Sequence, residues 1–238
     1  MKNATKMGSN RTGLQMSPLD AKRLLENAAM TTPPSGGPDL LMALRGDYID
    51  EAGVVGTVPP PGTVTGVVKS GAEMLTGDRP QVLIDKLGER LAFERGGTRL
   101  YDALLAKCGG GAAALDAEVP LDVLERFRNE EAAHALMIAA ALEKLGADPT
   151  AMTPCADLVG VESQGLMQAI TDPRTTLSQS LHAMLVAELA DHQGWQLLIA
   201  LAEQMGHDGL AHDCRTAFEE EERHLASIRA WVVAATLE

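Results

Sequence analysis

The sequence predicts an all-α fold, and three observations support that prediction. The chain has 238 residues and is 45% hydrophobic, which is enough to bury a core, yet only 3% of it is aromatic. Ala, Leu and Met are abundant, and they favour helices over a sheet of β-branched and aromatic residues. Four long segments also carry apolar residues close to helical spacing.

Residues 1–77 are expected to form an irregular extension with short helices. Its beginning is polar and rich in Gly, Ser and Asn, and residues 18–30 follow as a short helix. Proline and glycine clusters at 31–38 and 58–62 break the chain, and a second short helix is expected between them at 39–44. The Leu and Val content is too high for a free linker, so we expect packing against the other helices or a second subunit.

Residues 78–238 are expected to form a separate domain of four long helices, the first at 78–107. Asp78 suits the N-cap of that helix and Pro80 its first turn. The second helix is expected at 120–145, where Gly146 and a following Asp-Pro pair end it.

Residues 147–174 are long for a connection between neighbouring helices, which usually takes about 2–8 residues. The segment holds three prolines and a short helix expected at 157–170. A helix of about 25 residues is roughly 38 Å long, so a chain that returns to the starting end needs a connection of this size. We therefore expect a crossover that leaves the third helix, 176–205, parallel to the second. The tight turn that follows makes the fourth helix, 208–235, antiparallel to the third.

Charge and cysteine usage argue against several functions. The net charge of −13 and the isoelectric point near 4.9 oppose a nucleic-acid partner. The three cysteines form no Cys-x-x-Cys motif, so neither a disulfide framework nor a rubredoxin-type iron site is indicated, and a reducing cytoplasm fits. The chain shows no secretory signal, and no run approaches the roughly 20 apolar residues that span a bilayer. We expect a cytoplasmic protein without a membrane partner.

Two Glu-x-x-His motifs carry the clearest functional signal. Glu131 and His134 form one motif in the second expected long helix, and Glu221 and His224 form the other in the fourth. Residues i and i+3 share a helix face, so each helix can present a carboxylate and an imidazole to one metal ion. One such motif alone would be weak evidence, but two in matching helices indicate a metal site.

Two further glutamates complete the pattern. Glu94 precedes Glu131 by 37 residues, and Glu188 precedes Glu221 by 33. In each antiparallel helix pair, a rise of about 1.5 Å per residue brings the two carboxylates to a similar height. Glu188 also lies in the apolar run 184–190, where an unpaired carboxylate would be costly. Four carboxylates with two imidazoles suit iron or manganese.

Each of these residues also has an ordinary interpretation. An acidic run such as 219–222 usually forms a solvated face, and we expect that for Glu219 and Glu222. Glu94 alone would be an ordinary surface charge. Four histidines have no matching partner and are expected to be structural or exposed: His182, His192, His207 and His212.

The ordered set of six resembles the ferritin-like superfamily of di-iron and di-manganese carboxylate proteins, of the rubrerythrin and bacterioferritin type without a rubredoxin domain. The resemblance covers residues 78–236 and implies a ferritin-like four-helix bundle with a long crossover between helices two and three. It implies two iron ions, or iron with manganese, that activate O2 or peroxide in an oxidase, peroxidase or ferroxidase. Glu131 and Glu221 would bridge the ions. The implied ligands are Glu94, Glu131, His134, Glu188, Glu221 and His224.

Further residues gain a role from the resemblance. Tyr101 and Trp195 each lie seven residues after a ligand Glu, and either could pass an electron to the metals or simply fill the core. Glu130 and Glu220 stand where relatives place an acid that hydrogen-bonds a ligating His. Asp191 resembles the extra carboxylate of rubrerythrins, but its short side chain favours a place on the surface.

Two glycines next to the first ligand also need a reason, because each costs about 1 kcal/mol in a helix interior. Gly96 and Gly97 permit either a close helix approach or room for a small molecule beside the metals; a simple kink is the alternative. The substrate and electron donor are expected to be separate molecules. The different-class alternative is a metal-free or metal-stabilised helical bundle that acts as an interaction module through its extension, and the extension itself suggests a homodimer.

Overall fold

The computed structural model describes residues 17–31, 37–62, 66–67, 80–109 and 119–237. All regular secondary structure within these ranges is helical, and they contain no strand. The chain divides into two compact units, Met1–Val54 and Val55–Glu238, and each is described by itself. An all-α fold is therefore confirmed.

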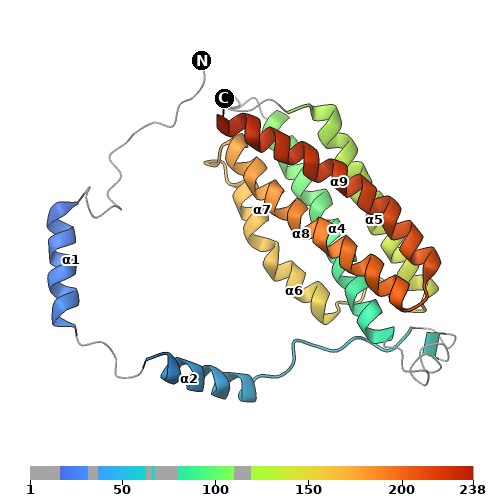
Figure 1. The fold of residues 1–238 in the computed structure, drawn as a ribbon, viewed down its shortest axis with the longest axis horizontal. Coiled ribbons are helices and arrows are strands. Elements are labelled where there is room, and N and C mark those ends of the chain that lie inside the picture. Colours follow the sequence, from blue (N-terminus) through green and yellow to red (C-terminus); the bar gives the residue numbers. More distant parts are fainter. Residues whose placement is uncertain (1–16, 32–36, 63–65, 68–79, 110–118, 238) are drawn as a thin grey trace. The chain divides into compact units, whose positions relative to one another are not determined.

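The first unit contains helices α1 (Pro18–Met30) and α2 (Pro38–Glu51), drawn in blue in Figure 1. Both begin with proline in the first turn, where the missing N–H costs no helical hydrogen bond. Helix α2 extends beyond the expected end at residue 44: it continues through Gly46, which a helix interior tolerates at a small cost, and ends at Glu51, shortly before Gly53. Neither helix has a buried residue, and both carry exposed leucines.

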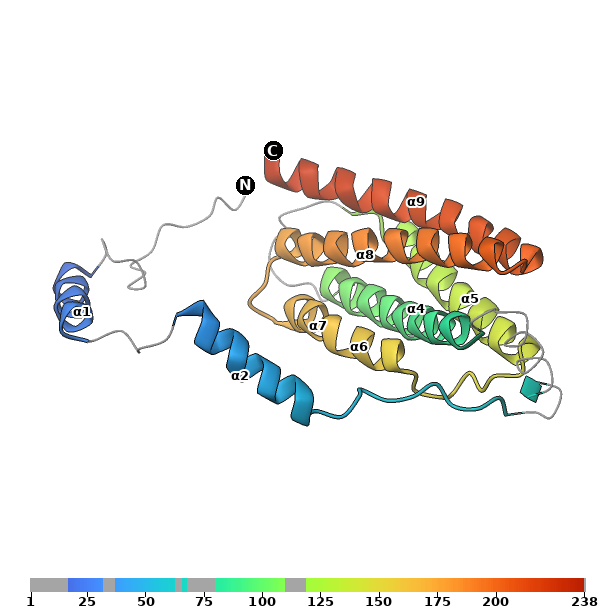
Figure 2. The same ribbon diagram turned by 60° about the horizontal axis from the view of Figure 1, so that its bottom comes forward.

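Within its described ranges 80–109 and 119–237, the second unit contains four long helices and two short ones (Figures 1 and 2). The boundaries of the long helices lie within a few residues of the predicted ones, whereas the single short helix expected at 157–170 is two helices. The long helices pack α4 against α5, α8 against α9, α4 against α8 and α5 against α9. The six helices are α4 (Pro80–Gly109), α5 (Leu121–Lys144), α6 (Pro154–Glu162), α7 (Gln164–Thr171), α8 (Leu177–Gln204) and α9 (Asp208–Leu237).

Two hydrophobic clusters define the helix directions. One cluster combines the C-terminal halves of α4 and α9 with the N-terminal halves of α5 and α8, and the other combines the opposite halves. Helices α5 and α8 therefore run in the same direction, and α4 and α9 run against them. This is the direction that the length of the crossover predicts. Helices α6 and α7 form that crossover, and both pack along α4 (Figure 2).

Local signals explain where the long helices begin and end. Thr176 and Gln179 form a capping box at the start of α8, in which each side chain pairs with the other residue's backbone N–H. Gly146 and Gly206 follow α5 and α8 with φ of 81° and 71°, a left-handed conformation that glycine adopts without steric cost.

The segment that leads into α4 contacts the long helices. Val58 packs against one of the hydrophobic clusters, and the Gly62 N–H donates to the carbonyl of Gly146 at 2.9 Å. Part of the expected extension therefore belongs to the second unit. The boundary expected at residue 77 lies outside the described residues and stays a prediction.

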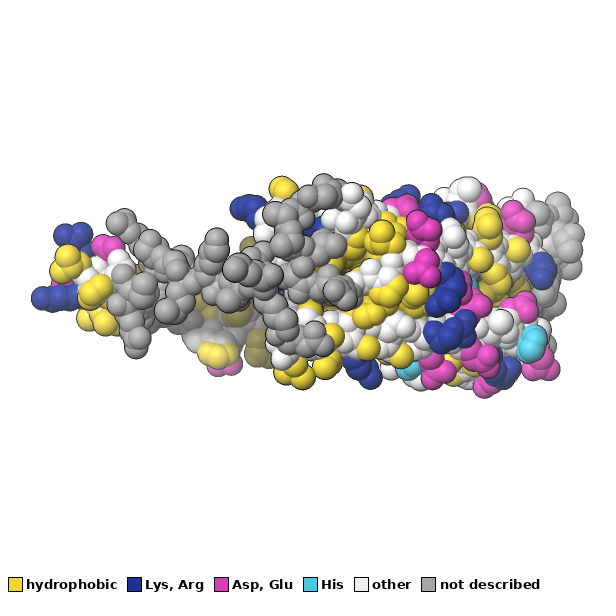
Figure 3. All heavy atoms as spheres, turned by 90° about the horizontal axis from the view of Figure 1, so that it is seen from above, with side chains coloured by type: hydrophobic (Ala, Val, Ile, Leu, Met, Phe, Trp, Pro, Cys, Tyr) yellow, Lys and Arg dark blue, Asp and Glu magenta, His cyan; other side chains and the backbone are white. Residues whose placement is uncertain are grey.

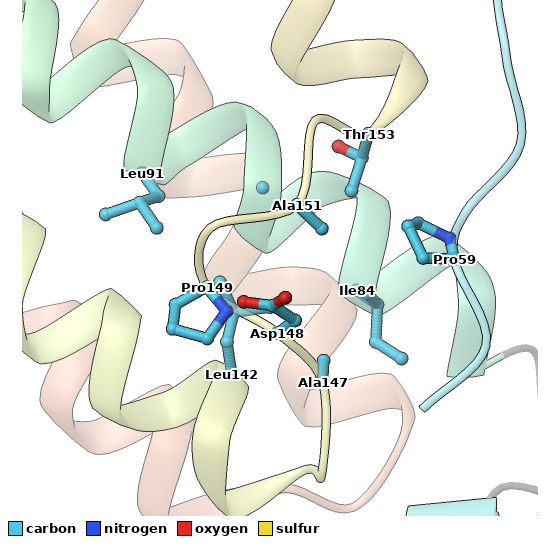
Figure 4. Close-up of a pocket in the computed structure, with 10 residues that line it drawn as sticks. Pro59, Ile84, Leu91, Leu142, Ala147, Asp148, Pro149, Ala151 and Thr153 are labelled. Atoms are coloured by element: carbon cyan, nitrogen blue, oxygen red, sulfur yellow. The ribbon is translucent and has the colours of Figure 1, made fainter. Parts of the chain in front are cut away.

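A cavity of about 10 Å³, room for roughly one water molecule, lies between α4 and the loop after α5 (Figure 4). Pro59, Ile84 and Leu142 line it together with that loop, and Asp148 is its charged residue. None of the six expected metal ligands borders it. The cavity is therefore a packing feature rather than the candidate site.

On the face shown in Figure 3, acidic, basic and hydrophobic side chains lie side by side. Among the described residues, no helix combines the length and the apolar character that crossing a membrane requires.

Replacing Gly88 by Ala should weaken the contact between α4 and the start of α6. An added Cβ would lie 2.4 Å from Thr153 Oγ1, whereas a Cβ on Gly160 in α6 meets nothing within 4 Å. Both changes put alanine in a helix, so the shared gain in helix propensity cancels in the comparison. We expect the free energy of unfolding of Gly88→Ala to be about 1–3 kcal/mol below that of Gly160→Ala in chemical denaturation. Equal stabilities would contradict this contact.

Candidate metal centre

Six buried ionisable side chains from the four long helices converge in the interior of the second unit. Each is at most 4% exposed. Burial of so many polar groups is costly unless they are paired, protonated or bound to a metal. The six are the expected ligands: Glu94 from α4, Glu131 and His134 from α5, Glu188 from α8, and Glu221 and His224 from α9.

Their donor atoms form two groups, each within 4.8 Å. We name them the first donor group, with Glu131, Glu188, Glu221 and His224, and the second donor group, with Glu94, His134 and Glu221. Glu221 belongs to both groups, so its two oxygens can serve two ions. Glu131, the other residue expected to bridge, belongs only to the first group.

Both histidines turn Nδ1 towards the carboxylates. His134 Nδ1 lies 2.8 Å from Glu221 Oε1 and 3.4 Å from Glu94 Oε2. His224 Nδ1 lies 3.0 Å from Glu221 Oε2 and 3.6 Å from Glu131 Oε1. Glu221 therefore sits between the two imidazoles, with one oxygen facing each ring.

The opposite nitrogen of each ring is held by an acid from the facing helix. His134 Nε2 donates to Glu220 Oε2 at 2.8 Å, and His224 Nε2 donates to Glu130 Oε2 at 2.7 Å. The pairing is crosswise, since the α9 acid holds the α5 ring and the α5 acid holds the α9 ring. A proton kept on Nε2 leaves the Nδ1 lone pair directed inward, the tautomer that a metal ligand requires.

Several inward-facing atoms make no hydrogen bond. Among the described residues, these buried atoms include both oxygens of Glu94 and of Glu221, and Nδ1 of both histidines. Glu131 Oε2 and Glu188 Oε2 are also buried without a hydrogen bond. Buried donors and acceptors are almost always satisfied, so a cluster of exceptions needs an explanation. The set of oxygens with imidazole nitrogen fits iron or manganese.

The pKa values of the metal-free cluster also favour a bound cation. Burial, together with repulsion between carboxylates, raises the pKa of Glu131 well above its usual range and that of Glu188 to about 8. Burial alone would lower the pKa of His134, but the neighbouring carboxylates of Glu221 and Glu94 outweigh it and raise the value to about 10. Burial alone would raise the pKa of Glu221, but His134 and His224 lower it instead. The metal-free cluster therefore holds protons that a bound cation would replace.

Two aromatic side chains lie directly beside the cluster. Tyr101 is fully buried and its hydroxyl donates to Glu188 Oε1 at 2.5 Å. Burial raises the pKa of Tyr101 well above its usual value, so the phenol stays protonated. Trp195 is also fully buried, and its ring meets the ring of His134 edge-on at 5.5 Å between centroids. Both aromatic residues are within reach of the donor groups.

Arg90 is a site residue that the sequence pattern did not indicate, and the surface position expected for Asp191 is wrong. Asp191 is 2% exposed, because Arg90 Nη1 lies 2.6 Å from its Oδ1 inside the protein. Arg90 Nε also lies 3.2 Å from Glu94 Oε1. The available signal was the i, i+4 spacing of Arg90 and Glu94, which is normally a surface ion pair.

The two glycines after Glu94 differ in role. A Cβ on Gly97 would lie 2.1 Å from Glu131 Oε2, whereas a Cβ on Gly96 would meet nothing within 4 Å. Of the three explanations offered for them, close helix approach applies to Gly97, which makes room for a carboxylate of α5.

The remaining expectations concern residues outside the cluster. Glu219 and Glu222 are exposed, as expected. His182 and His212 are exposed too, and His207 is half-buried. His192 is half-buried and packs against Phe218. None of these four histidines belongs to a donor group.

Comparisons of the chain with family models, curated proteins and solved structures give no match. The class of protein is therefore defined by the fold and the site alone. It is an all-helical protein with a buried cluster of glutamates and histidines that is able to bind metal.

Metal binding should release at least two protons per chain near neutral pH, because without metal the pKa of Glu188 is about 8, that of His134 is about 10, and that of Glu131 is raised well above its usual range. Protons compete with the cation, so the apparent affinity should increase from about pH 6 to about pH 8. Calorimetric titration with Mn²⁺ in buffers of different ionisation enthalpy measures the release. Binding without any proton release would contradict the protonated cluster.

Replacing Gly97 by Ala should displace the Glu131 carboxylate and weaken metal binding about tenfold or more. Gly96→Ala is the matched control, because it adds the same methyl group one residue away, where nothing lies within 4 Å. Equilibrium dialysis with Mn²⁺ compares the two variants. Equal affinities would show that Glu131 does not depend on the space above Gly97.

Proposed function

We propose that α4, α5, α8 and α9 form a ferritin-like four-helix bundle that holds two iron ions, or iron with manganese, and activates O2 or peroxide. One observation carries this proposal: the six donor side chains predicted from sequence spacing lie in one buried cluster, with two donor groups that share Glu221. The directions of the four long helices and the crossover between α5 and α8 also agree with such a bundle.

The charge of the cluster supports two ions. Its four glutamates, when ionised, balance the charge of two divalent cations, and the neutral imidazoles add nitrogen ligands. Carboxylate oxygens combined with imidazole nitrogens are ligands that iron and manganese accept. Calcium, in contrast, is usually bound by oxygen ligands alone, and sulfur-rich sites favour zinc. The shared Glu221 would keep the ions close together.

The residues around the cluster each have a defined task in this proposal. Iron or manganese, when bound, supplies open coordination positions for O2 or peroxide and the electrons for its reduction. Glu130 and Glu220 orient the two imidazoles through Nε2. The Tyr101 hydroxyl oxygen lies 2.5 Å from Glu188 Oε1 and keeps its proton there, at the edge of the first donor group. The hydrophobic clusters on both sides exclude water from this position.

Oxidase, peroxidase and ferroxidase chemistry all begin with this step, and each would make the chain an oxidoreductase. Because the chain has no Cys-x-x-Cys motif, a separate small molecule or protein would supply electrons. The acidic charge of −13 favours cationic over nucleic-acid partners.

An interaction module is the second candidate, and helices α1 and α2 favour it. Leu24 and Leu25 of α1 and Met42 of α2 are between 58% and 70% exposed, and neither helix buries a residue. In that case the metal cluster would only stabilise the bundle, and partner binding would survive its removal.

Metal-free protein given Fe²⁺ without oxygen and then exposed to air should develop near-ultraviolet charge-transfer absorption with about two irons per chain. Glu131→Ala combined with Glu221→Ala should abolish this absorption while circular dichroism remains helical. Glu219→Ala combined with Glu222→Ala is the matched control, since both residues are exposed neighbours of the site.

The control pair should keep the absorption of the unmodified protein. If the unmodified protein binds no iron, the enzyme proposal is wrong. If it binds iron but never reacts with O2 or peroxide, the metal is structural and the interaction module is favoured.

A further inference from the structure

The candidate centre is nearly two-fold symmetric in sequence and in space. Glu188 of α8 lies 94 residues after Glu94 of α4, and Glu221 of α9 lies 90 residues after Glu131 of α5. The ligating histidines and the acids that hold them are related by the second of these shifts. The two halves of the centre can therefore be compared at equivalent positions.

Glu94 and Glu188 are the ligands that lie outside the two Glu-x-x-His motifs, and we call them the terminal ligands. Their carboxylates are held by groups of different charge. Glu188 Oε1 accepts a hydrogen bond from the neutral phenol of Tyr101 at 2.5 Å. Glu94 Oε1 instead lies 3.2 Å from the cationic Nε of Arg90. In both cases one oxygen is held and the other faces the donor groups. Only the second donor group thus has a permanent positive charge on its terminal ligand.

The positions equivalent to Arg90 and Asp191 show that this charge has no counterpart in the other half. The shift that relates α4 to α8 places Met184 where α4 has Arg90, and it places Asp191 where α4 has Gly97. Met184 is a buried neutral residue of the hydrophobic core. The ion pair of Arg90 and Asp191 therefore occurs in only one half of an otherwise symmetric centre.

The fold holds the Arg90 guanidinium in a fixed place. Arg90 is 4% exposed, and a Cβ on Gly194 of α8 would lie 2.6 Å from its Nη1. Its guanidinium lies 4.5 Å from the Phe93 ring centroid and 5.4 Å from that of Trp195. Nη1 also donates to the backbone carbonyl of Asp191 at 2.9 Å. A charge buried in this way is screened much less than a surface charge.

We propose that Arg90 makes the two donor groups unequal, so that the first donor group binds the first divalent ion and the second donor group binds the next ion more weakly. This inference rests on the proposed two-ion function. Arg90 is a positioning residue here, because it acts on the metal site through its ion pair with Glu94. It forms no such ion pair with a residue that belongs to the first donor group alone.

Two physical effects work in the same direction. The guanidinium repels an incoming cation at close range, and it competes for the electron density of the Glu94 carboxylate. The second donor group also offers three residues, whereas the first offers four. Asp191 offsets part of the arginine charge, so its removal should make the inequality larger.

The matched histidines provide the direct test. In metal-free full-length protein titrated with Mn²⁺, His224→Ala should weaken binding of the first ion about tenfold or more, because it damages the first donor group. His134→Ala should change it by less than about threefold, since it damages the group that fills last. In a symmetric centre the two variants would lose equal affinity.

Variants of the charged pair test whether Arg90 is the cause. Arg90→Met with Asp191→Asn copies the neutral Met184 and should narrow the difference between the two histidine variants, leaving the part that comes from the smaller number of donors in the second group. Asp191→Asn alone should widen the difference in affinity loss between His224→Ala and His134→Ala. This single variant provides the test if the double variant does not fold. Arg90→Lys keeps the charge and should keep the difference.

The possible outcomes separate this inference from the proposed function. Two Mn²⁺ per chain with equal losses in the histidine variants, or a larger loss in His134→Ala, would overturn the unequal loading and leave the two-ion site intact. A difference that persists unchanged both in the Arg90→Met, Asp191→Asn double variant and in Asp191→Asn alone would overturn the role of Arg90. Absence of any Mn²⁺ binding in the unmodified protein would overturn both.

Discussion

Four carboxylates in a helical interior are the constraint on which the rest of the second unit depends. Isolated ionised carboxylates cannot be buried at acceptable cost, so each must be protonated, paired or bound to a cation. The protein shows parts of each solution: raised pKa values at Glu131 and Glu188, histidines on both sides of Glu221, and Arg90 on Glu94. These partners still leave several buried oxygens without a hydrogen bond.

The architecture brings these groups together by simple means. Parallel α5 and α8, linked by a crossover along α4, let two antiparallel helix pairs face each other with their ligands at one level. Gly97 and Gly194 then open space for Glu131 and Arg90. The acids Glu130 and Glu220 come from the neighbouring helix in each case, so the α5–α9 contact itself sets the orientation of both rings.

Much of this arrangement could be predicted, because helices translate residue spacing into position. The rise per residue placed Glu94 level with Glu131, and the i, i+3 rule put each histidine beside its glutamate. Arg90 and Asp191 could not be predicted in the same way, because oppositely charged residues on helices usually face water, and their burial depends on the α4–α8 contact. The crosswise pairing of Glu130 and Glu220 likewise depends on how α5 and α9 meet, which no local pattern encodes.

The most direct test of the account is the metal content of protein purified without added metal, determined by elemental analysis alongside the Glu131→Ala, Glu221→Ala double variant. The account predicts about two ions of iron, or iron with manganese, per chain in the unmodified protein and almost none in the double variant. Folded protein that carries no transition metal and takes up none when iron or manganese is offered would contradict it.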